Sequence, residues 1–227
     1  MAKFNANIFK CRDFASSEDI VGMSKFKLSY LAPVKAKIHE LMPDPQGPLN
    51  DHLLVASFKD EKSREAAFTQ LVRKYQERLY WHIRRMVVEH EDTNDILQNV
   101  FIKVWKNLGE FREESNLYTW LYRIGTNEAL TWIEQQKRRS SVSLSGNEDI
   151  FADRLTAQKD FDPNKIEWKL QQAIHTLPEK QKLVFNLRYY DEMPYEEMAG
   201  VLGTSVGALK ASYHHAVKKV EAFITGN

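Results

Sequence analysis

The sequence predicts an all-α protein made of two small helical domains joined by a flexible linker. Apolar residues recur at three- and four-residue steps from about residue 61 onward, and no segment alternates apolar and polar residues as a β-strand does. A serine-rich stretch without periodicity, "SSVSLSGNEDIFADRLTAQKDFD", separates two periodic parts. The expected organisation is an N-terminal extension at 1–60, a first helical domain at 61–139, a linker at 140–161 and a second helical domain at 162–227.

Composition limits the class of protein. The chain has 227 residues, of which 43% are hydrophobic and 28% charged, so it can bury a core. Its net charge of +1 argues against a protein that coats a polyanion. The single cysteine, Cys11, excludes an internal disulfide and a cysteine-built zinc site. No apolar run approaches the ~20 residues that cross a bilayer, and the N-terminus lacks a signal-peptide stretch, so we expect a cytoplasmic protein.

The N-terminal extension carries three prolines in "LMPDPQGPLND" and little periodicity. We expect residues 1–60 to be weakly structured, with an interaction arm as the alternative.

The first domain is expected to contain three helices. The first runs from about residue 61 to 89, with apolar residues on one stripe. In "EDTNDILQNVFIKVWKNL", Asp92 is expected to cap the second helix and Gly109 to end it. After the polar loop "GEFREESN", the third helix, "LYTWLYRIGTNEALTWIEQQKRR", can pack against the first two. Its core-facing residues and two aromatic residues of the second helix are expected in the core: Trp120, Leu121, Ile124 and Leu130, with Phe101 and Trp105.

The second domain is expected to begin at Asp162 and Pro163, a cap followed by a first-turn proline. Helices are expected at about 163–176, 178–190, 195–202 and 205–224.

The last two of these helices have the pattern of a helix-turn-helix. Ala199 is a small residue where the helices cross, Gly203 can adopt positive φ in the turn, and Ser205 can cap the second helix. No Asp or Glu occurs from Gly203 to Val220, which suits contact with DNA. A solvated basic helix that closes a small bundle is the alternative interpretation.

The sequence does not favour an enzyme or a metal protein. His214 and His215 diverge by about 100° on a helix and cannot share a metal ion as an i, i+4 pair can. The chain has no glycine-rich phosphate loop, and "HEDTND" lacks the second histidine of a zinc protease motif. We therefore expect no catalytic residues, no metal and no cofactor.

Several motifs occur in the order found in one family. The segments "DTNDILQNVFIKVW", "FREESNLYTWLYRIGTNEAL" and "LPEKQKLVFNLRYYDEMPYEEMAGVLGTSVGALKASYHHAVKKV" resemble bacterial RNA polymerase sigma factors of the extracytoplasmic-function (ECF) group of the sigma-70 family. The resemblance covers about 66–224 and implies that the first domain is sigma region 2 and the second is region 4. Region 2 would bind core polymerase and the minus-ten promoter element and assist strand opening. Region 4 would insert its helix-turn-helix into the minus-thirty-five element.

The resemblance also implies residue roles and partners. The residues facing the polymerase β′ clamp helices would be Asp92, Asp95, Gln98, Asn99 and Ile102. Those facing minus-ten DNA would be Phe111, Ser115, Asn116, Tyr118, Asn127, Lys137, Arg138 and Arg139. Those facing minus-thirty-five DNA would be Thr204, Ser205, Lys210, Ala211, His214, His215 and Lys218. The β flap of core RNA polymerase is a further expected contact, promoter DNA is the nucleic-acid partner, and many members of the group are inhibited by an anti-sigma factor. The resemblance places such a protein at the nucleoid.

Other interpretations stay open at this point. Asp92 and Asp95 could serve only to compensate the helix dipole, and the basic residues 137–139 could do the same at the other end of a helix. Glu113, Glu114, Glu128 and Glu134 place acids near the expected DNA face. The alternative function is a stand-alone helix-turn-helix regulator with a helical sensor or dimerisation domain.

Overall fold

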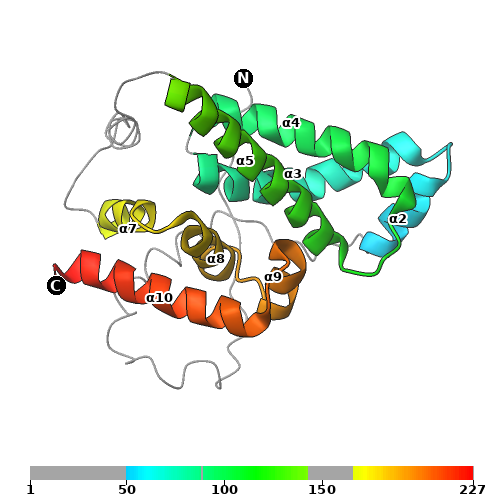
Figure 1. The fold of residues 1–227 in the computed structure, drawn as a ribbon. Coiled ribbons are helices and arrows are strands. Elements are labelled where there is room, and N and C mark those ends of the chain that lie inside the picture. The colour runs from blue at the N-terminus through cyan, green and yellow to red at the C-terminus, as the bar shows by residue number, and fades with distance from the viewer. Residues whose placement is uncertain (1–49, 88, 143–165, 227) are drawn as a thin grey trace.

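The computed structural model describes residues 50–87, 89–142 and 166–226, and every regular element in these ranges is a helix (Figure 1). The all-α prediction is therefore confirmed for this part of the chain. The expected extension up to residue 49, most of the linker and the helix start at Asp162 and Pro163 lie outside the described residues. None of the described helices is both long and apolar enough to cross a membrane.

Four of the described α-helices form an N-terminal bundle around α3. The elements are α2 (Asp51–Lys59), α3 (Arg64–Val87), α4 (His90–Asn107), the 3-10 turn η2 (Leu108–Glu110) and α5 (Leu117–Val142). The apolar stripe expected on the first helix is the core face of α3, where Leu71, Leu79 and Ile83 are completely buried. Helices α4 and α5 pack against α3 and against each other, which buries the faces predicted from their periodicity.

Helix α2 corrects the expectation that residues 1–60 are weakly structured, because residues 51–59 form a regular helix. The Asn50 side chain caps it by accepting a hydrogen bond from the His52 N–H at 3.1 Å. Its inner face buries Leu54, Val55 and Phe58. With two and a half turns, α2 is too short for apolar periodicity to stand out beside the preceding prolines.

The ends of α4 also differ from the prediction. The helix begins at His90 after an N-cap Glu89 that makes no side-chain cap, and Asp92 lies inside the first turn. Asp92 is therefore not the N-cap residue, and its carboxylate lies near the positive end of the helix dipole. At the other end the chain continues through Gly109 as η2, so the glycine does not stop the backbone there. The expected core residues of α5 are buried or partly buried, whereas Trp105 on α4 is 40% exposed, contrary to expectation.

The C-terminal bundle consists of α7 (Ile166–His175), α8 (Glu179–Tyr189), α9 (Tyr195–Leu202) and α10 (Val206–Thr225). The described helices begin and end within about three residues of the predicted positions. Aromatic side chains fill its core, with the rings of Phe185 and Tyr189 stacked at 5.1 Å.

The two bundles pack directly on each other. Figure 1 shows α8 and α9 beneath the N-terminal bundle, with α5 above α9, and α3 also contacts α8. Leu183, Leu187 and Met193 of the C-terminal bundle belong to the same buried cluster as the core of the N-terminal bundle. We call this packing of the two bundles the closed arrangement.

Candidate nucleic-acid interface

The helix-turn-helix formed by α9 and α10 has the geometry that its sequence predicts. Gly203 has φ 62° and ψ 32°, the left-handed conformation that favours glycine, and its N–H donates to the Ala199 carbonyl at 2.9 Å. The Ser205 hydroxyl accepts from the Ala208 N–H at 3.4 Å and caps α10. The free amides of the first turn of α10 therefore open on solvent beside an exposed Thr204.

The outer face of α10 is polar and exposed. Leu209 and Val217 face the core, and Tyr213 packs partly against it. All seven residues expected at minus-thirty-five DNA are exposed: Thr204, Ser205, Lys210, Ala211, His214, His215 and Lys218. Neither histidine belongs to a group of three potential metal ligands within the described residues. This face can therefore present cationic and hydrogen-bonding groups to the edge of a duplex.

A second surface lies on α4. Asp95, Gln98, Asn99 and Ile102 are exposed on one stripe, and Asp92 is partly exposed at its start. The stripe continues into an apolar groove with a volume of about 500 Å³. The groove is lined by Phe68, Val72, Gln76, Leu97, Gln98, Phe101, Ile102 and Trp105. Acidic and amide groups beside an apolar groove suit a protein partner better than a DNA phosphate.

Sequence reasoning missed the groove because it assigned Trp105 to the core. The ring packs edge-on against Phe58 and Phe68, at centroid distances of 5.2 and 4.9 Å, yet its outer face is open. Ile102, one turn earlier on the same helix and already assigned to the polymerase-facing stripe, is the sequence feature that could have indicated the groove. Two large apolar residues one turn apart on an exposed helical face are typical of an interaction surface.

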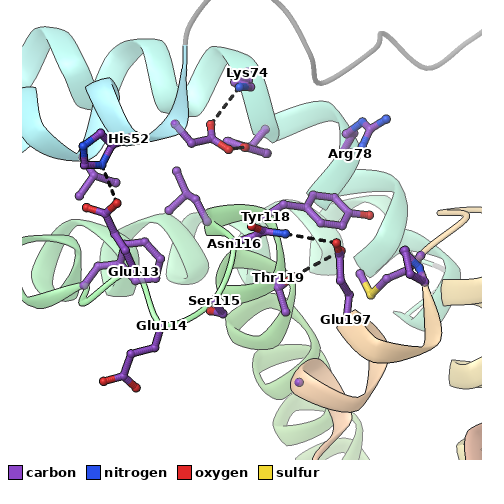
Figure 2. Close-up of a pocket in the computed structure, with 18 of the residues that line it drawn as sticks. His52, Lys74, Arg78, Glu113, Glu114, Ser115, Asn116, Tyr118, Thr119 and Glu197 are labelled. Carbon is purple, nitrogen blue, oxygen red and sulfur yellow. Dashed lines mark hydrogen bonds and ion pairs between the residues drawn. The ribbon is translucent and has the colours of Figure 1, made fainter. Parts of the chain in front are cut away.

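A cleft of about 1190 Å³ lies between α2, the loop after η2, the start of α5 and α9 (Figure 2). Ser115, Asn116 and Tyr118, three of the residues predicted to face minus-ten DNA, line this cleft. Burial raises the pKa of the Tyr118 hydroxyl above its usual range, so this group stays neutral. A neutral ring beside amide and hydroxyl groups can stack on a base and bond to its edge.

Phe111 does not have the exposure expected of a base-stacking residue. Its side chain is 7% exposed, and its ring packs against Trp120 with the centroids 5.1 Å apart. Phe111 fixes the start of the loop to the core of the bundle and lines the wall of the cleft, and its contact with minus-ten DNA stays a prediction. Its aromatic character in a polar loop did not distinguish an anchor from a base contact.

The other expected minus-ten residues lie along α5. Asn127 is exposed at mid-helix, and Lys137, Arg138 and Arg139 are exposed near its C-terminal end. Glu128, one of the four glutamates that the sequence places near the expected DNA face, forms an ion pair with Lys103 of α4. That pair offsets the charge of one carboxylate near the expected path of DNA.

Helix α2 supports the loop from the side opposite α9. The His52 ring Nδ1 lies 2.6 Å from Glu113 Oε2, and the Lys59 ammonium donates to the Phe111 carbonyl at 3.4 Å. Glu113 has φ 58°, an uncommon conformation for a residue with a side chain. The sequence could not reveal these contacts because α2 itself was not predicted.

A buried charge cluster joins the bundles. Asp191, after α8, points into the N-terminal bundle, and 1% of its side chain is exposed. It accepts from Arg85 Nη1 at 2.9 Å and from Tyr122 Oη at 3.4 Å, and His82 Nδ1 lies 3.3 Å away. Burial alone would raise the pKa of the Asp191 carboxyl, but Arg85 and His82 hold it below its usual value. The carboxyl is therefore ionised, and His82 donates to it.

Two further acids of the C-terminal bundle contact the N-terminal bundle. Glu197 of α9 accepts from Asn116 Nδ2 at 3.2 Å and from Thr119 Oγ1 at 3.4 Å (Figure 2). Glu179 at the start of α8 forms an ion pair with Lys137 near the end of α5. Asn116 and Lys137 are both residues expected at minus-ten DNA.

These features are typical of a helical DNA-binding protein made of two bundles. The sigma-70 region 2 model matches residues 71–139, and the sigma-70 region 4 model matches residues 167–220. The RNA polymerase sigma-H factor of Pseudomonas aeruginosa is 32% identical over 71% of this chain and 88% of its own length. The ECF RNA polymerase sigma-E factor of Escherichia coli is 30% identical over 76% of this chain and 93% of its own.

Solved structures share the fold. CnrH in complex with the cytosolic domain of CnrY has a TM-score of 0.57 and 24% identity, covering 78% of this chain and 98% of that one. The sigma factor RpoE in complex with the anti-sigma factor NepR, from Bartonella quintana, has a TM-score of 0.56 and 19% identity, covering 70% and 96%. The chain described here belongs to the ECF group of the sigma-70 family. The N-terminal bundle contains region 2, and the C-terminal bundle contains region 4.

Proposed function

We propose that this chain binds core RNA polymerase and directs it to a restricted class of promoters, reading two elements and helping to open the downstream one. The observation that supports this most is the presence, in one chain, of an acid-free helix-turn-helix, a separate polar cleft and an exposed acidic and amide-rich stripe on α4. A stand-alone regulator would need the first feature and neither of the others.

Polymerase binding is assigned to α4. The exposed stripe of Asp92, Asp95, Gln98 and Asn99 would pair with basic and polar groups of the β′ clamp helices. Ile102 and the adjoining apolar groove would supply the buried contacts that give affinity. Region 4 would contact the β flap.

Opening of the minus-ten element is assigned to the cleft and to α5. Ser115, Asn116 and Tyr118 would hold an unstacked base, and Asn127 would contact the same strand. The three basic residues 137–139 would contact phosphates of the duplex upstream. Phe111 contributes by holding the loop in place.

Recognition of the minus-thirty-five element is assigned to α10. Ser205 and the first-turn amides would meet a phosphate, and Lys210 and Lys218 would contribute charge. His214 and His215 would reach base edges or phosphates. The chain would act at the nucleoid, would itself catalyse no reaction, and could be controlled by an anti-sigma factor, the class of partner that NepR represents for the Bartonella protein.

Run-off transcription tests the proposal. Purified chain is added to core polymerase on a library of promoter fragments, and transcripts are sequenced to recover the elements used. The proposal expects transcripts that share two spaced elements and that depend on both proteins. An active core and a folded chain that yield no transcript from any fragment would refute it.

The same library separates the alternative function. A stand-alone regulator should select duplex fragments by itself, with no change on adding core polymerase. The proposed sigma factor should select them strongly only together with the core, since the few cations of α10 bind weakly alone.

A further inference from the structure

Three acidic residues of region 4 contact region 2 in the closed arrangement. Glu179 pairs with Lys137, Glu197 accepts from Asn116 and Thr119, and Asp191 enters the cluster with Arg85 and His82. The acids come from the starts of α8 and α9 and from the segment between these helices. We call these three residues the acidic edge of region 4; all three contact region 2.

Two of these three contacts fall on residues assigned to minus-ten DNA. We propose that the acidic edge of region 4 occupies the minus-ten surface in place of DNA, so that the free chain is autoinhibited at that surface. This inference rests on the proposed function for the assignment of Asn116 and Lys137. The closed arrangement itself does not depend on that assignment.

Glu197 is the residue that competes most directly. The Asn116 side-chain amide nitrogen, which would donate to an acceptor on a base edge or phosphate, donates a hydrogen bond to the Glu197 carboxylate. Thr119, 5% exposed beneath, donates to the other carboxylate oxygen. Figure 2 shows Glu197 reaching from α9 toward Asn116 across the edge of the cleft. A strand that used the same donors would have to displace it.

Asp191 makes the closed arrangement specific. Its carboxylate is desolvated, and the Arg85 and His82 side chains that meet it are themselves nearly or fully buried. Such a cluster is satisfied only when the two bundles are in this one register. The Lys137–Glu179 pair is more than half exposed and adds little affinity, but it places another acid at a basic residue assigned to DNA.

In contrast to the minus-ten surface, the recognition face of α10 stays open to solvent. Lys210, His214, His215 and Lys218 are all exposed in the closed arrangement. The closed chain thus leaves its minus-thirty-five surface open and covers part of its minus-ten surface. Separation of the bundles is required for full promoter contact.

The first experiment compares two neighbouring carboxylates. Glu196 and Glu197 lie on the same turn of α9 and both line the cleft, but Glu197 makes the contacts to Asn116 and Thr119. The probe is a fluorescein-labelled single strand that carries the minus-ten sequence recovered by run-off transcription. Its affinity is measured for the full chain without polymerase, and for the Glu197→Ala and Glu196→Ala variants. Circular dichroism confirms that all three are folded.

We expect Glu197→Ala to raise the affinity for the strand by about tenfold, the size of one charge-assisted hydrogen bond, and Glu196→Ala to raise it by less than about twofold. Equal gains would mean that only general charge repulsion was relieved, and no gain in Glu197→Ala would mean that the carboxylate does not compete. Either result would overturn the inference.

A second experiment needs no knowledge of the promoter to detect closure. In a Cys11→Ser background, Lys137→Cys and Glu179→Cys place two thiols at the exposed end of the interface. A short reducible thiol cross-linker should join them within one chain. The locked chain should lose binding of the labelled strand and regain it on reduction in the same sample.

The outcomes separate the two proposals. Failure of the thiols to cross-link within a chain, or unchanged strand binding by the locked chain, refutes autoinhibition while run-off transcription still succeeds. Absence of transcripts with efficient cross-linking refutes the sigma-factor function and leaves the closed arrangement standing.

Discussion

Asp191→Asn tests how strongly the buried charge cluster holds the two bundles together. The substitution keeps the size of the side chain and removes its charge. It leaves the Arg85 guanidinium, 11% exposed, without the carboxylate that it meets at 2.9 Å. Removing one partner of a buried ion pair costs about 3–5 kcal/mol, and we take about 3 because Arg85 retains some contact with water.

At 1.4 kcal/mol for each factor of ten, about 3 kcal/mol corresponds to a shift of about 100-fold in the ratio of closed to open chains. A chain that favours the closed arrangement by about a hundred to one would then populate both forms about equally. The variant should therefore contain a large open population, with each bundle still folded on its own core.

Paired spin labels read this population directly. In a Cys11→Ser background, Gln135→Cys on α5 and Lys219→Cys on α10 place labels at two exposed positions of different bundles. The parent chain should give one narrow distance distribution, and Asp191→Asn a broad one. Glu196→Gln removes the same charge from an exposed site and should leave the distribution narrow.

The reasoning would be refuted if Asp191→Asn kept the narrow distribution, or if Glu196→Gln broadened it equally. An Arg85→Met background supplies a further check, because the Asp191→Asn change should then cost much less. Equal costs in both backgrounds would show that the pair is not the source of the effect.

Three other predictions concern separate parts of the chain. Ile102→Asp should weaken binding to core polymerase at least about tenfold in a competition assay, and should change the free energy of unfolding by no more than about 0.5 kcal/mol. Leu53→Asp makes the same kind of change at another exposed apolar residue and should leave polymerase binding intact. Gly203→Ala should lower the free energy of unfolding, measured by urea titration, by about 1–2 kcal/mol, because alanine is strained at the φ of 62° that this position requires. The added Cβ has no neighbouring atom within 4 Å, so new contacts should not alter this strain. An unchanged urea midpoint would contradict the prediction. Burial, and to a smaller extent the nearby Lys182 ammonium, lowers the pKa of His175 from 6.5 to about 4. Between these two pH values the unfolded chain binds more protons than the folded chain. The free energy of unfolding should therefore fall as the pH is lowered from 6.5 to about 4, by at most about 3 kcal/mol. His175→Gln should flatten that slope in urea titrations, and a slope that survives the substitution would assign it to other groups.

The helix-turn-helix could be predicted because each of its parts is a local rule. Gly203 adopts positive φ, Ser205 caps its helix, and the spacing of Leu209 and Val217 selects the buried face. Each is a consequence of residues within one or two turns, so a single sequence contains the information. The same holds for the long stripe of α3.

The features that could not be predicted depend on contacts between distant segments. The orientation of Phe111 depends on its packing against Trp120, on the far side of an irregular loop, and that of Trp105 on its packing against Phe58, on a helix that was not predicted. Helix α2 is stabilised by packing and by Asp51, which binds Lys74 and Tyr75 of α3. Local pattern does not report such contacts.

The packing of the two bundles against each other is the largest feature that could not be predicted from the sequence. Asp191 reads in the sequence as a turn residue after α8, and nothing nearby indicates that it would be buried. Its partners Arg85 and His82 stand more than a hundred residues earlier, on a helix whose apolar stripe already explains its fold. A buried charge is identified only when the other elements around it are placed.

The position of α4 decides how polymerase could open the closed chain. In Figure 1, α4 lies on the side of the N-terminal bundle away from α8 and α10, so its docking stripe is accessible while the bundles remain together. A partner that touches only α4 binds the closed and open forms equally well, and such a partner cannot shift the balance between them. Opening therefore requires a second contact that region 4 makes only when it has left region 2.

A last prediction rests on the proposed function. A fragment containing only the β′ clamp helices should bind the chain and leave the narrow distance between the labels at positions 135 and 219 unchanged. Complete core polymerase, which also offers the β flap to region 4, should replace it with a longer distance. If the clamp fragment alone lengthened the distance, docking on α4 would itself distinguish the two forms, and the equal affinity of α4 for its partner in both forms would be refuted.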